Sequence, residues 1–381
     1  MATAAKITVQ NNNILKSLQV FFESILRQET ISAILIPQKL PMKNVVMPAL
    51  VTDPENLSNI DPIAPVFPMN AGRVAAKLTR KPIGGKIVAV MRPCEIRSFV
   101  ELVKLKQANP DEIVLVGIDC LGAYQNRDYF QLAGDDFGET TRTFYRNALS
   151  GKGTATGDIE ISNACKACEY PIPQNADVLI GLLGVDIDNE LLVQAQTEQG
   201  KDLLENLNLS GSDVPSRRES TVASLIAERI AYRDAMFEKT QQHINSIEKL
   251  TTYFANCVNC YNCRVACPVC YCKECVFCTD AFDHEPSQYL QWSKRKGIIK
   301  MPTDTLFFHL TRLAHMSTAC VGCGQCSNAC PNDIPVMEVF RTISQKTQKA
   351  FNYEAGRDMD EKPPLSEFRE DEFTNVVGLH N

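Results

Sequence analysis

The sequence predicts an α/β domain in its first half and a mostly helical, cysteine-rich region in its second half. Two observations lead to this prediction. Up to Gly181, short apolar runs alternate with segments whose apolar residues have helical spacing, a pattern typical of buried strands covered by helices. Beyond residue 215, long stretches with helical spacing are separated by closely spaced cysteines.

Four apolar runs are expected to form the strands of the first domain. Each is almost continuous and is bounded by proline, glycine or charged residues, as in strands that are buried on both faces. They span residues 33–36, 86–91, 113–118 and 176–181. Two helices are expected at residues 14–26 and 95–106, and the second carries apolar side chains at Ile96, Phe99, Val100 and Val103.

The second half is expected to consist mainly of helices. Residues 219–250 contain no glycine or proline and predict one long helix or two helices end to end, and residues 305–316 and 336–349 predict two more. The polar stretch at 201–218 is predicted to be a linker. We therefore place two domains at 1–214 and 215–350, followed by a polar tail at 351–381, acidic around 369–372, that either docks or is mobile.

Composition excludes several classes of protein. The chain has 381 residues, a formal net charge of −6 and a pI near 5.6, so it lacks the basic surface that nucleic-acid binding requires. No run of about 18 apolar residues is present, so we expect no membrane span. Sixteen cysteines are too few for a disulfide scaffold, and no apolar signal sequence is evident. The thiols are therefore expected to be metal ligands in a reducing cytoplasm.

Eight cysteines occur in two copies of one spacing, Cys257-x2-Cys260-x2-Cys263-x3-Cys267-Pro268 and Cys320-x2-Cys323-x2-Cys326-x3-Cys330-Pro331. This is the ligand pattern of proteins with two 4Fe-4S clusters, in which the cysteine before the proline ligates the other cluster. The predicted ligand sets are Cys257, Cys260 and Cys263 with Cys330, and Cys320, Cys323 and Cys326 with Cys267. Zinc is the alternative, but structural zinc sites use separated Cys-x2-Cys pairs.

The other eight cysteines form two further groups. Cys270, Cys272, Cys275 and Cys278 follow the first motif directly, and they are predicted to hold a third cluster or, as the alternative, zinc. Cys94 and Cys120 each follow a predicted strand, where binding sites of open α/β sheets gather. Taken alone, each of these two cysteines is expected to be a small buried hydrophobic residue. Together with Cys165 and Cys168 they predict a cluster within the α/β domain, for a total of three to four 4Fe-4S clusters.

Four segments of the first half carry a family resemblance: Arg-Pro-Cys-Glu-Ile-Arg at 92–97, Gly-Ile-Asp-Cys at 117–120, Cys-Lys-Ala-Cys at 165–168 and Ala-Asp-Val-Leu-Ile-Gly at 176–181. With these segments, residues 30–210 resemble the beta subunits of coenzyme F420-reducing hydrogenase and of formate dehydrogenase. The second half is similar to the helical ferredoxin module of heterodisulfide reductase and its relatives. The family's glycine-rich opening is missing here, and no Gly-x-Gly-x-x-Gly follows a strand.

The resemblance implies a flavoprotein-like first domain with FAD beside a 4Fe-4S cluster held by Cys94, Cys120, Cys165 and Cys168. It further implies an electron-transfer subunit that exchanges electrons with F420, NAD(P)H or formate and works with the catalytic subunit of a heterodisulfide reductase-like, hydrogenase or formate dehydrogenase complex. Arg92 is a candidate contact to the flavin phosphate or the cluster, or a salt-bridged arginine. The alternative function is a flavin-free iron-sulfur adaptor between partner subunits.

Two histidines in the predicted helix at 305–316 are given a structural role. His309 and His315 are six residues apart and so lie on different faces, which predicts surface or packing residues and not metal ligands. Leu306, Phe307, Leu310 and Leu313 are expected to form the apolar side of this helix.

Overall fold

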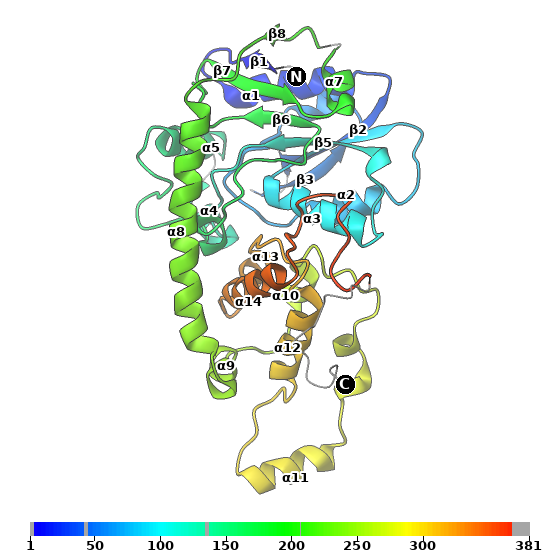
Figure 1. Cartoon of the computed structure of the whole chain (residues 1–381), viewed down its shortest axis with the longest axis vertical. Coiled ribbons are helices and arrows are strands. Elements are labelled where there is room, and N and C mark those ends of the chain that lie inside the picture. Colours follow the sequence, from blue (N-terminus) through cyan, green and yellow to red (C-terminus); the bar gives the residue numbers. More distant parts are fainter. Residues whose placement is uncertain (1–3, 42–44, 134–136, 206, 368–381) are drawn as a thin grey trace, which may run out of the picture.

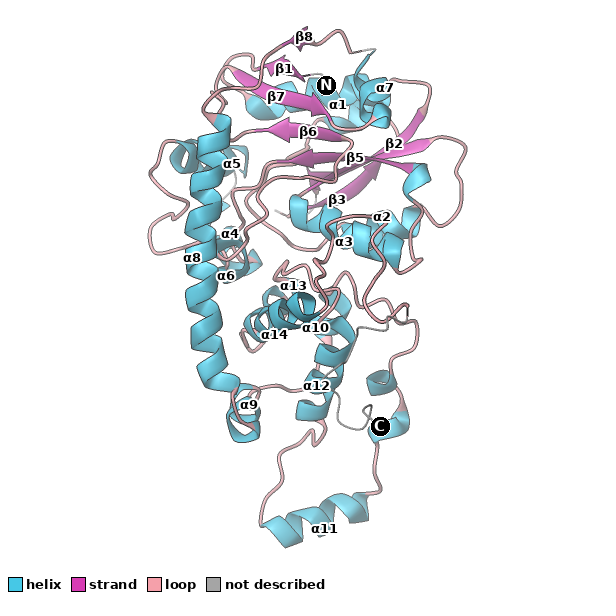
Figure 2. Ribbon diagram, in the orientation of Figure 1, coloured by secondary structure: helices cyan, strands magenta, loops and turns pink. Residues whose placement is uncertain are grey.

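The computed structural model describes residues 4–41, 45–133, 137–205 and 207–367. An α/β unit with one sheet lies at one end, and short helices and loops rich in cysteine form the other end (Figures 1 and 2). A long helix, α8 (Arg218–Ile244), runs beside both. The predicted acidic stretch at 369–372 lies outside the described residues. In the part of the chain that the structure describes, no helix has the length and apolar character needed to span a bilayer.

The sheet has eight strands in the order β3-β2-β4-β5-β6-β7-β1-β8. The four predicted strands are confirmed as its parallel centre, namely β2 (Ile31–Lys39), β4 (Lys86–Met91), β5 (Ile113–Ile118) and β6 (Val178–Gly181). Strands that were not predicted extend it on both sides with antiparallel pairing. They are β3 (Val46–Val51), β7 (Glu190–Ala195), β1 (Ala4–Thr8) and β8 (Ser210–Gly211).

Both faces of the central strands are buried, because successive side chains of a strand point to opposite faces. In β4, Val88 and Val90 join one core with α1 (Ile14–Leu26), whereas Ile87 and Ala89 join a second core with α2 (Gly72–Leu78) and α3 (Pro93–Lys104). The remaining helices of this unit are α4 (Asn126–Ala133), α5 (Phe137–Leu149), α6 (Asn163–Lys166), α7 (Glu198–Glu205) and the 3-10 turns η1 (Pro54–Leu57) and η2 (Pro110–Glu112).

The prediction of a linker at 201–218 was wrong, because α7 ends within this segment and β8 pairs there with β1. The helix prediction for 219–250 is confirmed in its two-helix form. The break falls at Ser246, whose Oγ accepts the Lys249 amide and so caps α9 (Ile247–Tyr253).

The cysteine-rich region contains α10 (Asn262–Ala266), α11 (Pro286–Lys296), α12 (Thr305–Met316), α13 (Gln325–Asn328), α14 (Val336–Ala350) and the turns η3 (Val276–Cys278) and η4 (Asp280–Phe282). The predicted helices at 305–316 and 336–349 are therefore confirmed. Figure 1 places α11 at the end of the molecule farthest from the sheet.

The described part of the tail docks on α3 and so connects the two halves. The hydroxyl of Tyr353 donates to the Glu101 carboxylate, with oxygen distances of 2.7 and 2.8 Å. Arg97 donates to the carbonyl oxygens of Ala355, at 2.6 Å, and Val321, at 3.3 Å. Because these donors and acceptors are buried, their pairing holds the tail against the α/β unit.

Candidate metal centres

The four cysteines of the α/β unit come together at the carboxyl edge of the sheet. Cys94 lies in the first turn of α3, directly after β4, and Cys120 lies two residues after β5. Cys165 is in α6, and Cys168 follows that helix. All four line one cavity, and Cys323 from the helical region lines it as well. The structure therefore brings together the group that the sequence predicts from three separate segments.

Two arginines, Arg92 and Arg229, line the same cavity as this first group. From α8, Arg229 donates to the carbonyl oxygens of Cys168 at 3.3 Å and Cys120 at 3.2 Å. Burial raises the pKa of the Cys120 thiol to about 11, and burial likewise raises the pKa of Cys94 well above its ordinary value. Buried thiols of this kind become thiolates when a metal supplies the compensating positive charge. The donor set therefore fits an all-cysteine 4Fe-4S cluster.

The second group (Cys257, Cys260, Cys263 and Cys330) and the third group (Cys320, Cys323, Cys326 and Cys267) each combine cysteines of both sequence motifs. Burial, together with the neighbouring thiols of Cys257, Cys260 and Cys330, raises the pKa of the Cys263 thiol to about 11, although Arg312 acts in the opposite direction. Charges act on a pKa in this way only when they are close in space. Cys263 therefore lies near two cysteines of its own motif and near the cysteine before the proline of the other motif.

The reciprocal relationship holds for the second motif. Burial raises the pKa of the Cys326 thiol well above its ordinary value, and the thiols of Cys267, Cys323 and Cys320 act in the same direction. The thiols near Cys263 and near Cys326 are thus those of the two predicted ligand sets, whose ligation of clusters stays a prediction.

The fourth group, Cys270, Cys272, Cys275 and Cys278, lies between α10 and the end of η3. Burial raises the pKa of Cys270, and the thiols of Cys272 and Cys275 add to this effect. Among the described residues, no three His, Cys, Asp or Glu side chains converge as the ligands of one metal ion must. A cubane contacts its four thiolates through four separate irons, so its ligands need not converge on one point. The choice between cluster and zinc stays a prediction.

Neighbouring groups are close to one another. After burial, the strongest influence that raises the pKa of Cys94 is the thiol of Cys323, which belongs to another predicted set. Cys267 has Cys270 and Cys320 as its thiol neighbours, and burial raises its pKa to about 11. The first group, the set of Cys320, Cys323, Cys326 and Cys267, and the Cys270 group therefore adjoin one another from the sheet edge into the helical region.

Arg312 of α12 contacts the cysteine groups, and the sequence reasoning missed it. Its Nη1 donates to Cys263 Sγ at 3.1 Å and its Nη2 to the Cys263 carbonyl at 3.2 Å. The guanidinium also lies over the Phe340 ring, 4.6 Å from the ring centre. Four thiols raise the pKa of Arg312 against the effect of burial, and they belong to three of the groups. They are the thiols of Cys263, Cys267, Cys326 and Cys270.

The predicted apolar side of this helix was partly wrong. Phe307 and Leu310 are 53% and 39% exposed, whereas Phe308, His309 and Arg312 are buried. The helix turns the His309 and Arg312 side chains toward the cysteines, whose sulfur atoms accept hydrogen bonds from them. A basic residue three positions after a histidine in an apolar helix was the available signal.

His309 is a packing residue, as predicted, and it also touches a cysteine. Its ring stacks on Phe254, with centroids 3.8 Å apart and planes at 9°, and its Nε2 lies 3.4 Å from Cys257 Sγ. Burial lowers the pKa of His309 to about 3, so the ring is neutral at physiological pH. A neutral imidazole with Nε2 protonated donates a hydrogen bond to the sulfur.

Arg92 lies beside the first group, and one nitrogen of its guanidinium, Nη2, is already hydrogen-bonded. Its Nη2 donates to the carbonyl oxygens of Ala64 and Val66, at 2.5 and 2.7 Å, and its guanidinium lies 5.1 Å from the centre of the Phe67 ring. The carboxyl ends of β4 and β5 carry cysteines in place of a glycine-rich turn. At this edge the described residues fit a cluster, and no glycine-rich phosphate-binding turn follows either strand.

Comparisons with known proteins bear on the second cysteine motif and on the chain as a whole. The family of 4Fe-4S binding domains matches residues 315–336, which contain the second cysteine motif. The F420-dependent formate dehydrogenase subunit beta of Methanocaldococcus jannaschii is 28% identical over 342 residues, 84% of this chain and 85% of that protein. Its counterpart from formate dehydrogenase 1 of Methanococcus maripaludis is 26% identical over 310 residues, 73% of this chain and 75% of that protein.

The predicted resemblance to formate dehydrogenase beta subunits is thereby confirmed over most of the chain. One solved structure, of the xenon-derivatised F420-reducing NiFe hydrogenase complex from Methanosarcina barkeri, matches 65% of this chain and 94% of its own chain, with a TM-score of 0.45 and 13% identity.

Proposed function

We propose that this protein is the electron-transfer subunit of a multisubunit oxidoreductase and carries single electrons through a series of 4Fe-4S clusters. The observation that carries the proposal is the pairing of Cys263 with Cys330 and of Cys326 with Cys267, since this crossing is the arrangement of two-cluster ferredoxins. The approach of Cys94 to Cys323 supports transfer between the α/β unit and the helical region.

In this proposal each group of four cysteines holds one cluster, which supplies one-electron chemistry when bound. The protein provides thiolates, excludes water and sets the charge around them. Arg229 holds the backbone at Cys120 and Cys168, and Arg312 places a positive charge among the helical groups. His309 fixes the orientation of Cys257 Sγ.

The finer proposal concerns the source of the electrons. The relatives are named as F420-dependent formate dehydrogenase subunits, and we propose that this chain likewise couples a two-electron carrier (F420 or NAD(P)H) or formate-derived electrons to the clusters, with FAD as the cofactor that joins the two. A catalytic subunit of a hydrogenase, formate dehydrogenase or heterodisulfide reductase-like complex is the proposed partner, in the cytoplasm.

The second candidate is a flavin-free adaptor that only conducts electrons between partner subunits. The engagement of Arg92 Nη2 with two backbone carbonyls favours it, because these two N–H groups are then not available to a flavin phosphate.

Anaerobic purification separates these functions. The proposed function requires about sixteen irons per chain, or about eight to twelve if one or two groups are empty, and paramagnetic signals after reduction with dithionite. Zinc in place of iron contradicts it. Acid release followed by chromatography then detects FAD, whose absence leaves the adaptor.

A further inference from the structure

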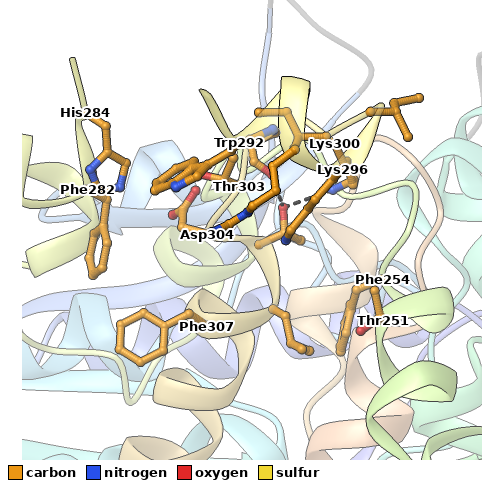
Figure 3. Close-up of a pocket in the computed structure, with 16 residues that line it drawn as sticks. Thr251, Phe254, Phe282, His284, Trp292, Lys296, Lys300, Thr303, Asp304 and Phe307 are labelled. Carbon is orange, nitrogen blue, oxygen red and sulfur yellow. Dashed lines mark hydrogen bonds between the residues drawn. The ribbon is translucent and has the colours of Figure 1, made fainter. Parts of the chain in front are cut away.

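A pocket that the proposed function does not use lies between α9, α11 and α12. It has a volume of about 540 Å³, which lies within the range typical of small-molecule sites. Figure 3 shows its lining, which includes Trp292 of α11, Phe307 of α12 and Thr251 of α9. No cysteine is among the described residues that line it. The pocket is thus distinct from the cysteine groups.

Aromatic rings form much of the pocket wall. Trp292 meets the His284 ring edge to face, with centroids 5.0 Å apart, and Phe282 meets Phe307 in the same manner at 5.5 Å. Figure 3 places His284, Trp292 and Phe282 on the same side of the pocket, across from Phe254. Aromatic side chains bind planar ring ligands by offset stacking or by edge-to-face contact.

The charge of the pocket favours an anion. Arg295, Lys296 and Lys300 line it, whereas Asp304 is the one acid among the described lining residues, and its Oδ1 accepts a hydrogen bond from Asn259 Nδ2 at 2.9 Å. Arg295 and Lys296 are exposed, and neither forms an ion pair with a described residue. Cations with free donors bind phosphate or carboxylate groups.

The pocket wall also contacts a cysteine of the proposed cluster series. Phe254 lines the pocket and stacks on His309, whose Nε2 lies 3.4 Å from Cys257 Sγ. Lys300 donates to the Cys257 carbonyl at 2.9 Å and to Thr305 Oγ1 at 3.0 Å. The Phe254 and His309 rings therefore lie between the pocket and Cys257 Sγ, whereas Lys300 contacts both the pocket and the Cys257 backbone.

We propose that this pocket binds an anionic ligand with a planar aromatic ring, of the class of phosphorylated flavin-type electron carriers. The ring stacks against the aromatic wall, and the phosphate pairs with Arg295 and Lys296. The role as a carrier rests on the proposed function, because it requires a cluster at Cys257; the binding itself does not.

The test is a fluorescence titration of the full chain, purified without oxygen, with riboflavin 5′-phosphate and with riboflavin, which has the same ring and no phosphate. The phosphorylated compound is expected to bind at least about tenfold more tightly, the change that 1.4 kcal/mol produces. The double variant Arg295→Gln/Lys296→Gln should weaken it about tenfold and leave riboflavin unchanged. Trp292→Ala should weaken both ligands.

The matched control is Lys294→Gln, on the same turn of α11 but absent from the lining, which should leave both affinities unchanged. The proposal is overturned if the two compounds bind with equal affinity. It is also overturned if neither Trp292→Ala nor the double variant changes the affinities. Iron and dithionite-reduced spectra are measured on the same samples. Full iron without ligand binding refutes the pocket alone, whereas pocket-dependent binding to an iron-free protein supports the pocket and refutes the proposed function.

Discussion

Arg312 Nη1 donates to Cys263 Sγ at 3.1 Å, and this contact places a buried cation among three groups of cysteines. The Arg312 residue is 4% exposed, and no carboxylate pairs with it among the described residues. An isolated buried charge is costly. The negative charge that compensates it must therefore come from the thiolates and whatever they bind.

Replacing Arg312 should change the reduction potential of the cluster assigned to Cys263. Arg312→Gln removes a positive charge that favours the reduced, more negative state, so the midpoint potential should fall by about 60 mV or more, equivalent to ~1.4 kcal/mol for one electron. Arg312→Lys should shift it less. A redox titration followed by paramagnetic resonance measures this. Lys294→Gln makes the same charge change at an exposed site and should have no effect; an unshifted potential in iron-replete Arg312→Gln contradicts the assignment.

The crossing of ligands predicts which substitutions belong together. Cys267→Ser should abolish the same paramagnetic signal as Cys320→Ser, whereas Cys330→Ser should abolish the signal that Cys257→Ser removes, because each pair is assigned to one cluster. Each variant should lose about four irons. If Cys267→Ser instead matches Cys257→Ser, the ligands do not cross.

The centre of the fold was predictable because burial on both faces makes the inner strands continuously apolar. The outer strands were not: β1, whose Lys6 side chain pairs with the Glu190 carboxylate of β7, and the two-residue β8 carry too little apolar signal. The spacing of the cysteines likewise predicted the neighbours of Cys263, since ligands on one turn have a fixed sequence separation. The burial of Arg312 was not predictable, because its sulfur acceptors lie about 50 residues away in the chain.

A buried ion pair should govern the attachment of α8 to the sheet. Arg218 Nη1 and Nη2 donate to the two oxygens of Asp119, at 2.6 and 3.0 Å, directly before Cys120. Arg218→Met leaves a buried carboxylate paired only with the amides of Leu182 and Leu183, and it should lower the free energy of unfolding by about 3 to 5 kcal/mol. Anaerobic urea unfolding measures this loss.

The control for this prediction is Arg146→Met. Arg146 pairs with Asp188 at 2.9 Å, but both side chains are more than 40% exposed, so the expected loss is below about 1 kcal/mol. Equal losses in the two variants would show that burial does not decide the strength of the Arg218 pair.

Asp61 should make the stability of the protein fall as the pH rises. Its Oδ2 accepts a hydrogen bond from Thr141 Oγ1 at 2.6 Å, while its Oδ1 has no partner among the described residues. Burial raises the pKa of Asp61 from 3.8 to about 7, although Thr141 and Arg92 act in the opposite direction. The folded protein thus holds this proton more tightly than the unfolded chain.

The stabilisation from Asp61 is therefore complete below about pH 4 and is lost as the pH rises to about 7, at up to about 1.4 kcal/mol per pH unit. Asp61→Asn keeps an uncharged side chain of the same shape at every pH. Relative to the wild type, this variant should gain about 2 to 3 kcal/mol in unfolding free energy between pH 5 and pH 8. Thr141→Val removes a hydrogen bond that lowers the pKa of Asp61, so the stability of this variant should continue to fall to a higher pH than that of the wild type. Parallel pH profiles for the wild type and Asp61→Asn would mean that the Asp61 carboxyl does not carry this proton in the folded state.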